Sequence, residues 1–430
     1  MSLDTIAIHA DQLLTMPEDA PALQNYDSQG DLEARDRAIC GLLEDAGVFV
    51  KDGVINWYGP WDERPDEARG NDVSQARAGV VTPGWVECHT HSVFAGDRAD
   101  EFVLRNAGRS YSDILEAGGG ILNTVDAVRE ASVDELAQSL LNRVFEFVRK
   151  GVTTLEVKSG YGLTLEDELK MLRAIDRVRD EDVPCELVSC FMGAHTVPRD
   201  FKDDREGYVD LICNEMIPAV SEEDLADYCD VFCDRGAFTV SEAERVLMTG
   251  KGHDMTPRIH AEQLSDSGGA MMAAELGASS ADHLEHVSKD ALKAMANSDV
   301  TAVVLPAVNV FLGTTDQLAP ARQALKVGCE VALSTDFNPG TAMTQDLGMV
   351  MNLACNLHQM TPGEALRGVT IGAAKAMDRD DIGRIRRGEP ANLTMLNAPH
   401  YQYIPYHVGT NHVSGVIQDG SIGYWTNTEG

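Results

Sequence analysis

From about residue 81 onward, short apolar segments alternate with longer amphipathic ones, and this alternation constrains the fold more than any other feature. Eight segments have the composition of buried strands, and helical stretches separate them. The predicted strands are Val86–Cys88, Thr153–Lys158, Glu186–Phe191, Asp230–Cys233, Arg258–Ala261, Ala281–His286, Thr301–Leu305 and Val331–Thr335. Eight strands that alternate with helices predict an α/β fold of the (β/α)8 TIM-like barrel type.

The segments between these strands have the periodicity of amphipathic helices. The clearest are Ser132–Lys150, Leu165–Asp180, Ser241–Thr249 and Lys289–Ala296. Ser132 and Glu135 have the spacing of a capping box, and Gly151 stands where a glycine commonly ends a helix. A doubly wound open sheet is the alternative fold, but no glycine-rich nucleotide-binding fingerprint follows an early strand.

Both ends of the chain differ from this alternating region. Residues 1–83 contain short β-type runs with a polar insertion around 17–45, and β-type segments return after about residue 372. We therefore expect a small β-sandwich domain built from residues 1–83 and 373–430. It would flank a barrel domain that comprises residues 84–372.

The net charge of −34 argues against binding to nucleic acid or to anionic membranes. No apolar run has the length of a membrane-spanning helix, and the first residues lack an export signal, so we expect a cytoplasmic protein. The nine cysteines show no pairing pattern, which is typical of reduced thiols. Acidity spread along the chain resembles adaptation to high salt, and an acidic surface for cationic partners is the alternative. The sequence does not decide the oligomeric state, although a homodimer is one arrangement that it allows.

The sequence Cys88-His89-Thr90-His91-Ser92 stands where the first barrel strand ends. Histidines at positions i and i+2 of a strand point to the same face and can share a metal ion, although a lone pair of this kind also arises by chance. Active sites of such barrels lie at the carboxyl ends of the strands. Half of the 12 histidines stand at these predicted ends, which favours the metal-site interpretation.

Other strand ends supply further ligands. The fifth strand carries His260 and the eighth is followed by Asp336. With the histidine pair they form a set of three imidazoles and one carboxylate, which suits a single Zn²⁺ or iron ion. His283 is the candidate for moving protons or polarising a carbonyl, and a buried structural histidine is its alternative role. For Lys158 we expect a structural role rather than that of a bridge between two metals.

These residues give the chain a resemblance to the amidohydrolase superfamily and, within it, to the imidazolonepropionases. Those enzymes of histidine degradation open the ring of 4-imidazolone-5-propanoate to N-formimidoyl-L-glutamate. The resemblance runs from about residue 48 to the C-terminus. It depends on the segments Cys88–Ser92, Phe94–Arg98, Glu156–Leu163, Phe191–Pro198, His260–Leu264 and Ser334–Thr341. It implies a barrel with a β-sandwich and hydrolysis of a cyclic amide C–N bond.

The resemblance also implies roles for individual residues. The metal ligands would be His89, His91, His260 and Asp336, and the catalytic residues His283, Asp336 and Gln263. The substrate contacts would be Arg98, Tyr161, His195, Gln263, Asn338, Gly340 and Thr341. The guanidinium of Arg98 could pair with the propionate carboxylate of the substrate, although a surface ion pair is its alternative role. Some family members have Glu where Gln263 stands, so a base at this position does not follow from the resemblance.

Two other functions compete with this interpretation. An aminohydrolase of the same superfamily, acting on a formimino, guanidine or nucleobase substrate, would share the metal site. The segments around Tyr161 and Asn338 favour the imidazolone substrate over these. A binding or structural protein with a vestigial barrel would not need all four metal ligands, and all four are present.

Overall fold

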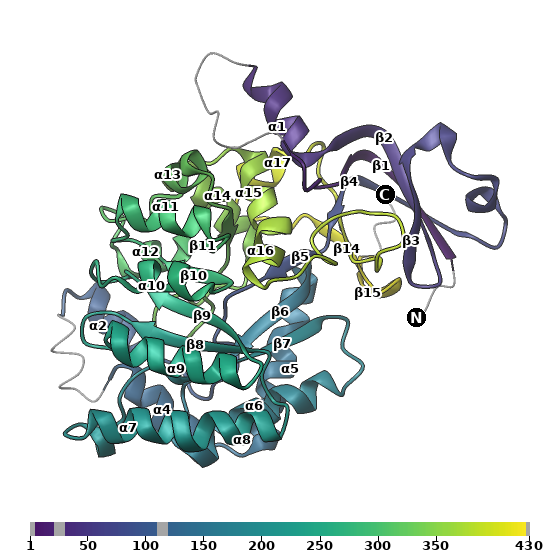
Figure 1. The fold of residues 1–430 in the computed structure, drawn as a ribbon. Helices are drawn as coiled ribbons and strands as arrows, with labels where there is room; N and C mark the ends of the chain where they lie inside the picture. The colour runs from purple at the N-terminus through teal and green to yellow at the C-terminus, as the bar shows by residue number, and fades with distance from the viewer. Residues whose placement is uncertain (1–4, 21–30, 110–118, 427–430) are drawn as a thin grey trace.

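The computed structural model describes residues 5–20, 31–109 and 119–426, which form a barrel and a separate mixed sheet (Figure 1). The eight barrel strands pair in chain order, each parallel to its neighbour. They are β5 (Trp85–Glu87), β6 (Val152–Lys158), β7 (Glu186–Ala194), β8 (Tyr228–Cys233), β9 (Thr256–Ala261), β10 (Ser280–His283), β11 (Thr301–Val304) and β12 (Val331–Leu333). The predicted barrel is confirmed.

The first and last barrel strands meet just beyond their carboxyl ends. Thr90, after β5, forms a parallel bridge with Phe337, after β12. The backbone N–H of His91 donates to the Phe337 carbonyl at 3.0 Å. These contacts bring the histidine pair beside the segment that carries Asp336, although the two are more than 240 residues apart in the chain.

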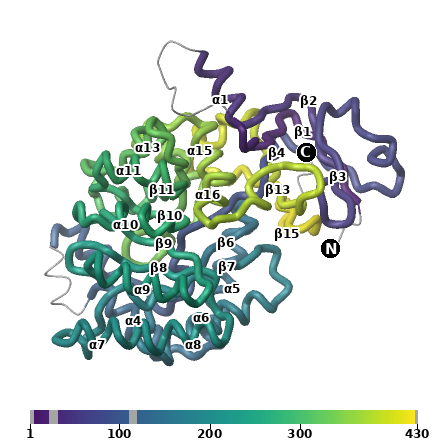
Figure 2. Tube along the Cα trace, viewed as in Figure 1, coloured from purple at the N-terminus to yellow at the C-terminus, as the bar shows by residue number. Residues whose placement is uncertain are grey.

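Helices cover the outside of the barrel (Figure 2). Ser132 and Glu135 form the predicted capping box, and Gly151, with φ of 96°, follows the end of the same helix. Within the described ranges, no helix combines the length and the apolar character that a membrane crossing requires. The helices of the barrel region are α2 (Ala99–Asn106), α4 (Ile121–Glu130), α5 (Val133–Arg149), α6 (Leu165–Arg179), α7 (Arg205–Leu211), α8 (Ile217–Glu222), α9 (Val240–Gly252), α10 (Gly269–Leu276), α11 (Lys289–Asn297), α12 (Pro306–Leu312), α13 (Ala321–Val327), α14 (Leu347–His358), α15 (Pro362–Gly368) and α16 (Ile371–Ala376).

Both ends of the described chain contribute to the second sheet, which has seven strands in the order β15-β14-β13-β4-β1-β2-β3. Its strands are β1 (Thr5–Leu14), β2 (Leu42–Lys51), β3 (Val54–Pro60), β4 (Ser74–Pro83), β13 (Leu393–Leu396), β14 (Val413–Gln418) and β15 (Ser421–Trp425). Antiparallel pairing of β4 with β13 joins the two contributions. The predicted module built from both ends of the chain is confirmed, and we propose 1–83, 84–372 and 373–430 as the division into domains.

The predicted polar insertion at 17–45 is in part regular structure. It contains helix α1 (Leu32–Cys40) and the start of β2, and residues 21–30 of it lie outside the described ranges. Asp36 on α1 is buried and accepts hydrogen bonds from the hydroxyl of Tyr401, at 2.8 Å, and from the N–H of Gly363, at 3.1 Å. One acidic side chain of this segment therefore attaches α1 to α15.

Candidate metal and active site

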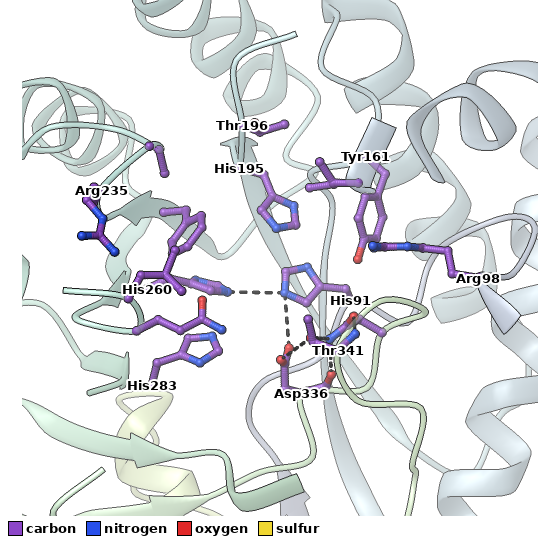
Figure 3. Close-up of a pocket in the computed structure, with 17 residues that line it drawn as sticks. His91, Arg98, Tyr161, His195, Thr196, Arg235, His260, His283, Asp336 and Thr341 are labelled. Carbon is purple, nitrogen blue, oxygen red and sulfur yellow. Dashed lines mark hydrogen bonds and ion pairs between the residues drawn. The ribbon is translucent and has the colours of Figure 1, made fainter. Parts of the chain in front are cut away.

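A cavity of about 350 Å³ opens at the carboxyl end of the barrel (Figure 3). All but two of the predicted site residues line it, and the exceptions are His89 and Gly340. The predicted residues in its wall are His91, Arg98, Tyr161, His195, His260, Gln263, His283, Asp336, Asn338 and Thr341. Residues from at least six strand ends therefore meet in one place, as the barrel topology requires.

Three of the four predicted metal ligands form a tight buried cluster. One side-chain nitrogen each from His89, His91 and His260 lies within 4.8 Å of the other two. Oδ1 of Asp336 lies 3.5 Å from His89 Nε2 and 3.6 Å from His91 Nε2. The structure thus brings together all four predicted ligands around one point.

Two buried carboxylates fix the orientation of these imidazoles. Asp282 Oδ2 lies 2.6 Å from Nδ1 of His89, and Asp230 Oδ1 lies 3.0 Å from Nδ1 of His260. A carboxylate on Nδ1 keeps the proton there and leaves the Nε2 lone pair free, which is the usual support of a metal-binding histidine. Neither carboxylate was predicted from the sequence as a support for the ligands. Their signal is an acidic residue within a fully or nearly fully buried strand.

The donor set fits a divalent cation. His89 Nε2 and Asp336 Oδ1 are buried and have no hydrogen-bond partner among the described residues. Burial lowers the pKa of His89 and His91 well below 6.5, so both imidazoles are neutral at physiological pH. Burial also raises the pKa of Asp336 to about 7. Neutral nitrogens and an unpartnered carboxylate oxygen that face one point are the ligands such an ion requires.

The backbone is strained where it presents the functional side chains. Positive φ values of 53°, 81° and 51° occur at Glu262, which directly precedes Gln263, and at His283 and Asp336 themselves. Non-glycine residues rarely adopt this conformation, which clusters at functional sites. The turn at His283 also ends β10 there, so the predicted extension of this strand to His286 is wrong. Likewise, β12 ends at Leu333, two residues earlier than predicted.

Lys158, the last residue of β6, lies in a buried network of charges. Its Nζ contacts Glu156 Oε1 at 2.6 Å and Asp230 Oδ2 at 2.8 Å. Burial opposes the charged ammonium, but the two carboxylates outweigh it and raise the pKa of Lys158. Because carbamylation requires the neutral amine, this environment favours the predicted structural role of Lys158.

Arg98 reaches the cavity between Glu101 and Gly340. Its Nε and one terminal nitrogen donate to Glu101 Oε2 at 2.9 and 2.7 Å. The other terminal nitrogen would lie 2.1 Å from a Cβ atom at position 340, so a larger residue there would displace the guanidinium from this position. Arg98 therefore forms an ion pair, but a mostly buried one and not the surface pair of its alternative role, and it also lines the cavity. Gly340 makes space for Arg98 instead of lining the cavity itself.

Asn338 shapes the loop that holds Asp336. Its Oδ1 accepts from the N–H groups of Gly340 and Thr341, both at 2.8 Å, and its Nδ2 donates to the Asp336 carbonyl at 2.6 Å. The hydroxyl of Thr341 donates to Asp336 Oδ2 at 3.3 Å. These bonds leave Oδ1 of Asp336 for the metal site.

On the opposite wall, His195 stacks on His91 with ring centroids 4.8 Å apart. Its Nδ1 lies 3.0 Å from the carbonyl of Gly160, which can only accept, so Nδ1 carries the proton. Burial lowers the pKa of His195 to about 3, which keeps this imidazole neutral. Its Nε2 is therefore an acceptor on the wall of the cavity.

The model of the amidohydrolase family matches residues 80–423. This chain belongs to that family. The family uses a divalent metal, and within the described residues the three-histidine cluster is the group that fits one. Imidazolonepropionase from Geobacillus thermodenitrificans is 44% identical to this amidohydrolase over 418 residues, which cover 96% of each chain.

A second relative of the same name and a solved structure of similar fold extend this comparison. Imidazolonepropionase from Shouchella clausii is 46% identical over 393 residues, covering 89% of this chain and 86% of its own. Among solved structures, 5-methylcytosine deaminase from Klebsiella pneumoniae, liganded with 5-fluorocytosine, superimposes with a TM-score of 0.70 at 15% identity, over 99% of this chain and 98% of its own. At this identity the similarity to the deaminase establishes the fold alone.

Proposed function

We propose that this amidohydrolase hydrolyses the ring C–N bond of 4-imidazolone-5-propanoate to give N-formimidoyl-L-glutamate. Relatives of 44% and 46% identity over most of the chain bear the name imidazolonepropionase. One structural observation supports the proposed hydrolysis. Three of the four predicted metal ligands and nearly all predicted substrate contacts, taken from six strand ends, line a single cavity.

We further propose that His89, His91, His260 and Asp336 hold one ion, either zinc or iron. When bound, such an ion acts as a Lewis acid, which polarises a carbonyl group and makes a water molecule more acidic. The ammonium of Lys158 is paired with two carboxylates, which supports a single ion over two ions bridged by a carbamylated lysine. Elemental analysis of the purified protein distinguishes zinc from iron and gives the number of ions per chain.

The reaction adds the elements of water across one ring bond. The oxygen bonds to the ring carbonyl carbon, the bond from that carbon to nitrogen breaks, and a proton goes to the nitrogen. The carboxylate of Asp336, which lines the cavity, is positioned to take the proton from the water. His283 lines the same cavity, and burial lowers its pKa well below 6.5, so its neutral imidazole can relay a proton to the nitrogen.

The remaining wall residues orient the substrate. Burial raises the pKa of Tyr161, so its hydroxyl stays protonated and can donate a hydrogen bond. The terminal nitrogen of Arg98 that does not contact Glu101 is available to the propionate carboxylate. Gln263 cannot act as a base, and its amide can hold the ring by donating and accepting hydrogen bonds.

The deciding assay incubates the purified protein, in high salt, with freshly generated imidazolonepropionate and follows the loss of the ultraviolet absorbance of the ring. We expect turnover that requires metal, gives formimidoylglutamate and releases no ammonia. Cytosine and a guanidine compound serve as controls, because an aminohydrolase would release ammonia from them. Failure to convert imidazolonepropionate with metal bound would overturn the proposal. The cytoplasmic location, the adaptation to high salt and the homodimer stay predictions.

A further inference from the structure

Arg235 is a second arginine in the wall of the cavity, and the catalytic scheme above does not use it. It lies in the loop after β8, and its side chain is exposed to solvent while it lines the cavity. Figure 3 shows Arg235 and Arg98 on opposite sides of the site. An exposed residue that also lines the cavity lies at its mouth, where a substrate enters.

The two arginines differ in how their charge is compensated. The guanidinium of Arg98 donates twice to Glu101. In the part of the chain that the structure describes, Arg235 has no ion pair, and the hydrogen bond that it makes comes from its backbone N–H to Asp234. Arg235 is therefore the cation at the cavity whose positive charge is not offset by a neighbouring carboxylate.

The carboxylate nearest in sequence to Arg235 is occupied by other donors. Asp234 is buried, and its Oδ2 accepts from the N–H of Leu264 at 2.6 Å. Its Oδ1 accepts from the hydroxyl of Ser265 and from the N–H of Arg235, both at 2.6 Å. These bonds join the loop after β8 to the loop after β9. They fix the backbone of Arg235 without engaging its guanidinium, which remains available to a ligand.

A positive charge at the cavity matters because the chain as a whole is strongly negative. A net charge of −34 repels an anionic substrate, and salt screens this repulsion only beyond the Debye length of about 10 Å at 0.1 M. Apart from the two arginines, the charged residue in the described cavity wall is Asp336, which adds a negative charge when ionised. A guanidinium at the mouth supplies the local attraction that a carboxylate ligand needs.

We propose that Arg235 attracts the propionate carboxylate at the mouth of the cavity as the substrate enters, before that group reaches Arg98, and so selects anionic imidazolones. This inference rests on the proposed function, because it takes the carboxylate to be that of the propionate arm. Arg235 acts in capture of the substrate, whereas Asp336 and His283 act in the chemical step. Its removal should therefore change kcat/KM more than kcat.

The test compares Arg235→Gln with the wild type in steady-state kinetics. We expect a loss of about 10-fold in kcat/KM, with kcat changed less than 2-fold. Arg77→Gln is the matched control, since it removes the same charge from an exposed residue of β4 in the other sheet. A substrate analogue that carries a propionamide in place of the propionate should show no difference between Arg235→Gln and wild type.

Binding of the product gives a second measurement that does not need turnover. Calorimetry with N-formimidoyl-L-glutamate should show a Kd about 10-fold weaker for Arg235→Gln than for Arg77→Gln. Equal kcat/KM and Kd in these two variants would overturn the inference, as would an equal loss with the propionamide analogue. A wild type that binds the product without converting the substrate contradicts the proposed function alone. A wild type that does neither contradicts both proposals.

Discussion

The two ends of the barrel differ in whether their polar side chains have hydrogen-bond or ion-pair partners. At the carboxyl end, His89 Nε2, His283 Nδ1 and Asp336 Oδ1 have no hydrogen-bond partner among the described residues. At the amino end, Glu330 precedes β12 and accepts from Nε and a terminal nitrogen of Arg367 at 2.8 and 2.9 Å. Nζ of Lys375 adds a third bond to the same carboxylate at 3.1 Å.

This difference separates function from stability within one architecture. Buried polar atoms are nearly always paired, so a cluster of unpaired ones at one end indicates a ligand site. Fully paired charges at the other end hold the helices α15 and α16 against the strands. Substitutions at the carboxyl end should therefore change metal binding and catalysis, and those at the amino end should change the free energy of unfolding.

Replacement of Asp336 by alanine should have the largest effect. The variant loses one of the four proposed metal ligands and the proposed acceptor of the water proton, so we expect kcat/KM to fall by at least about 10³-fold, equivalent to about 4 kcal/mol. The metal content should fall with it. Steady-state kinetics and elemental analysis measure both effects.

The control for this variant is Asp316→Ala, which removes an exposed aspartate from the loop after α12. It should retain wild-type activity and metal content. If Asp336→Ala bound metal at full stoichiometry, Asp336 would not be a ligand.

Replacement of Glu330 by glutamine tests the other end of the barrel. The change leaves the buried guanidinium of Arg367 without its counter-charge, and we expect a loss of about 3 kcal/mol in the free energy of unfolding near neutral pH. The kcat of the folded variant should stay unchanged. Urea titration monitored by circular dichroism measures the stability.

The pH dependence of this loss has a definite sign. Burial opposes ionisation of Glu330, but Arg367 and Lys375 outweigh it and lower its pKa below the ordinary 4.5. The carboxylate therefore stabilises the fold fully above pH 4.5, and this contribution disappears as the pH falls through the lower value of the folded state. The stability difference between Glu330→Gln and wild type should shrink in that range. A difference that did not depend on pH would show that charge is not its cause.

Asp282→Asn should have an intermediate effect, because it changes the support of a ligand and not the ligand. Without the carboxylate on Nδ1, His89 loses the group that orients its ring, and we expect metal affinity to fall 10- to 100-fold. Competition with a chelator measures this affinity. The similar variant Asp230→Asn should behave alike, and wild-type affinity in both would contradict the role assigned to these carboxylates.

The strands were predictable from the sequence because buried parallel strands are short, nearly continuous apolar runs. The predicted strand at 153–158 differs from β6 by one residue. The gathering of His89, His91, His260 and Asp336 was predictable because barrel topology brings strand ends together. The support of His89 by Asp282 was not, because the two residues are 193 positions apart and only the register of the folded barrel makes them neighbours. Nor could the sequence show that the carboxylate of Asp234 accepts hydrogen bonds from two residues of the loop after β9.

Tyr228→Phe should have the smallest effect and tests the amino end without a change of charge. The hydroxyl of Tyr228, at the start of β8, donates to the carbonyl of Met377 at 2.5 Å, which ties the barrel to the segment that leads to the second sheet. Phenylalanine keeps the ring and removes this bond, so we expect a loss of about 1 kcal/mol in the free energy of unfolding. Metal content and kcat/KM should equal those of the wild type, because Tyr228 lies at the end of its strand opposite to the cavity. A change in metal binding would show that the two ends of the barrel are coupled, and the separation of stability from function would then fail.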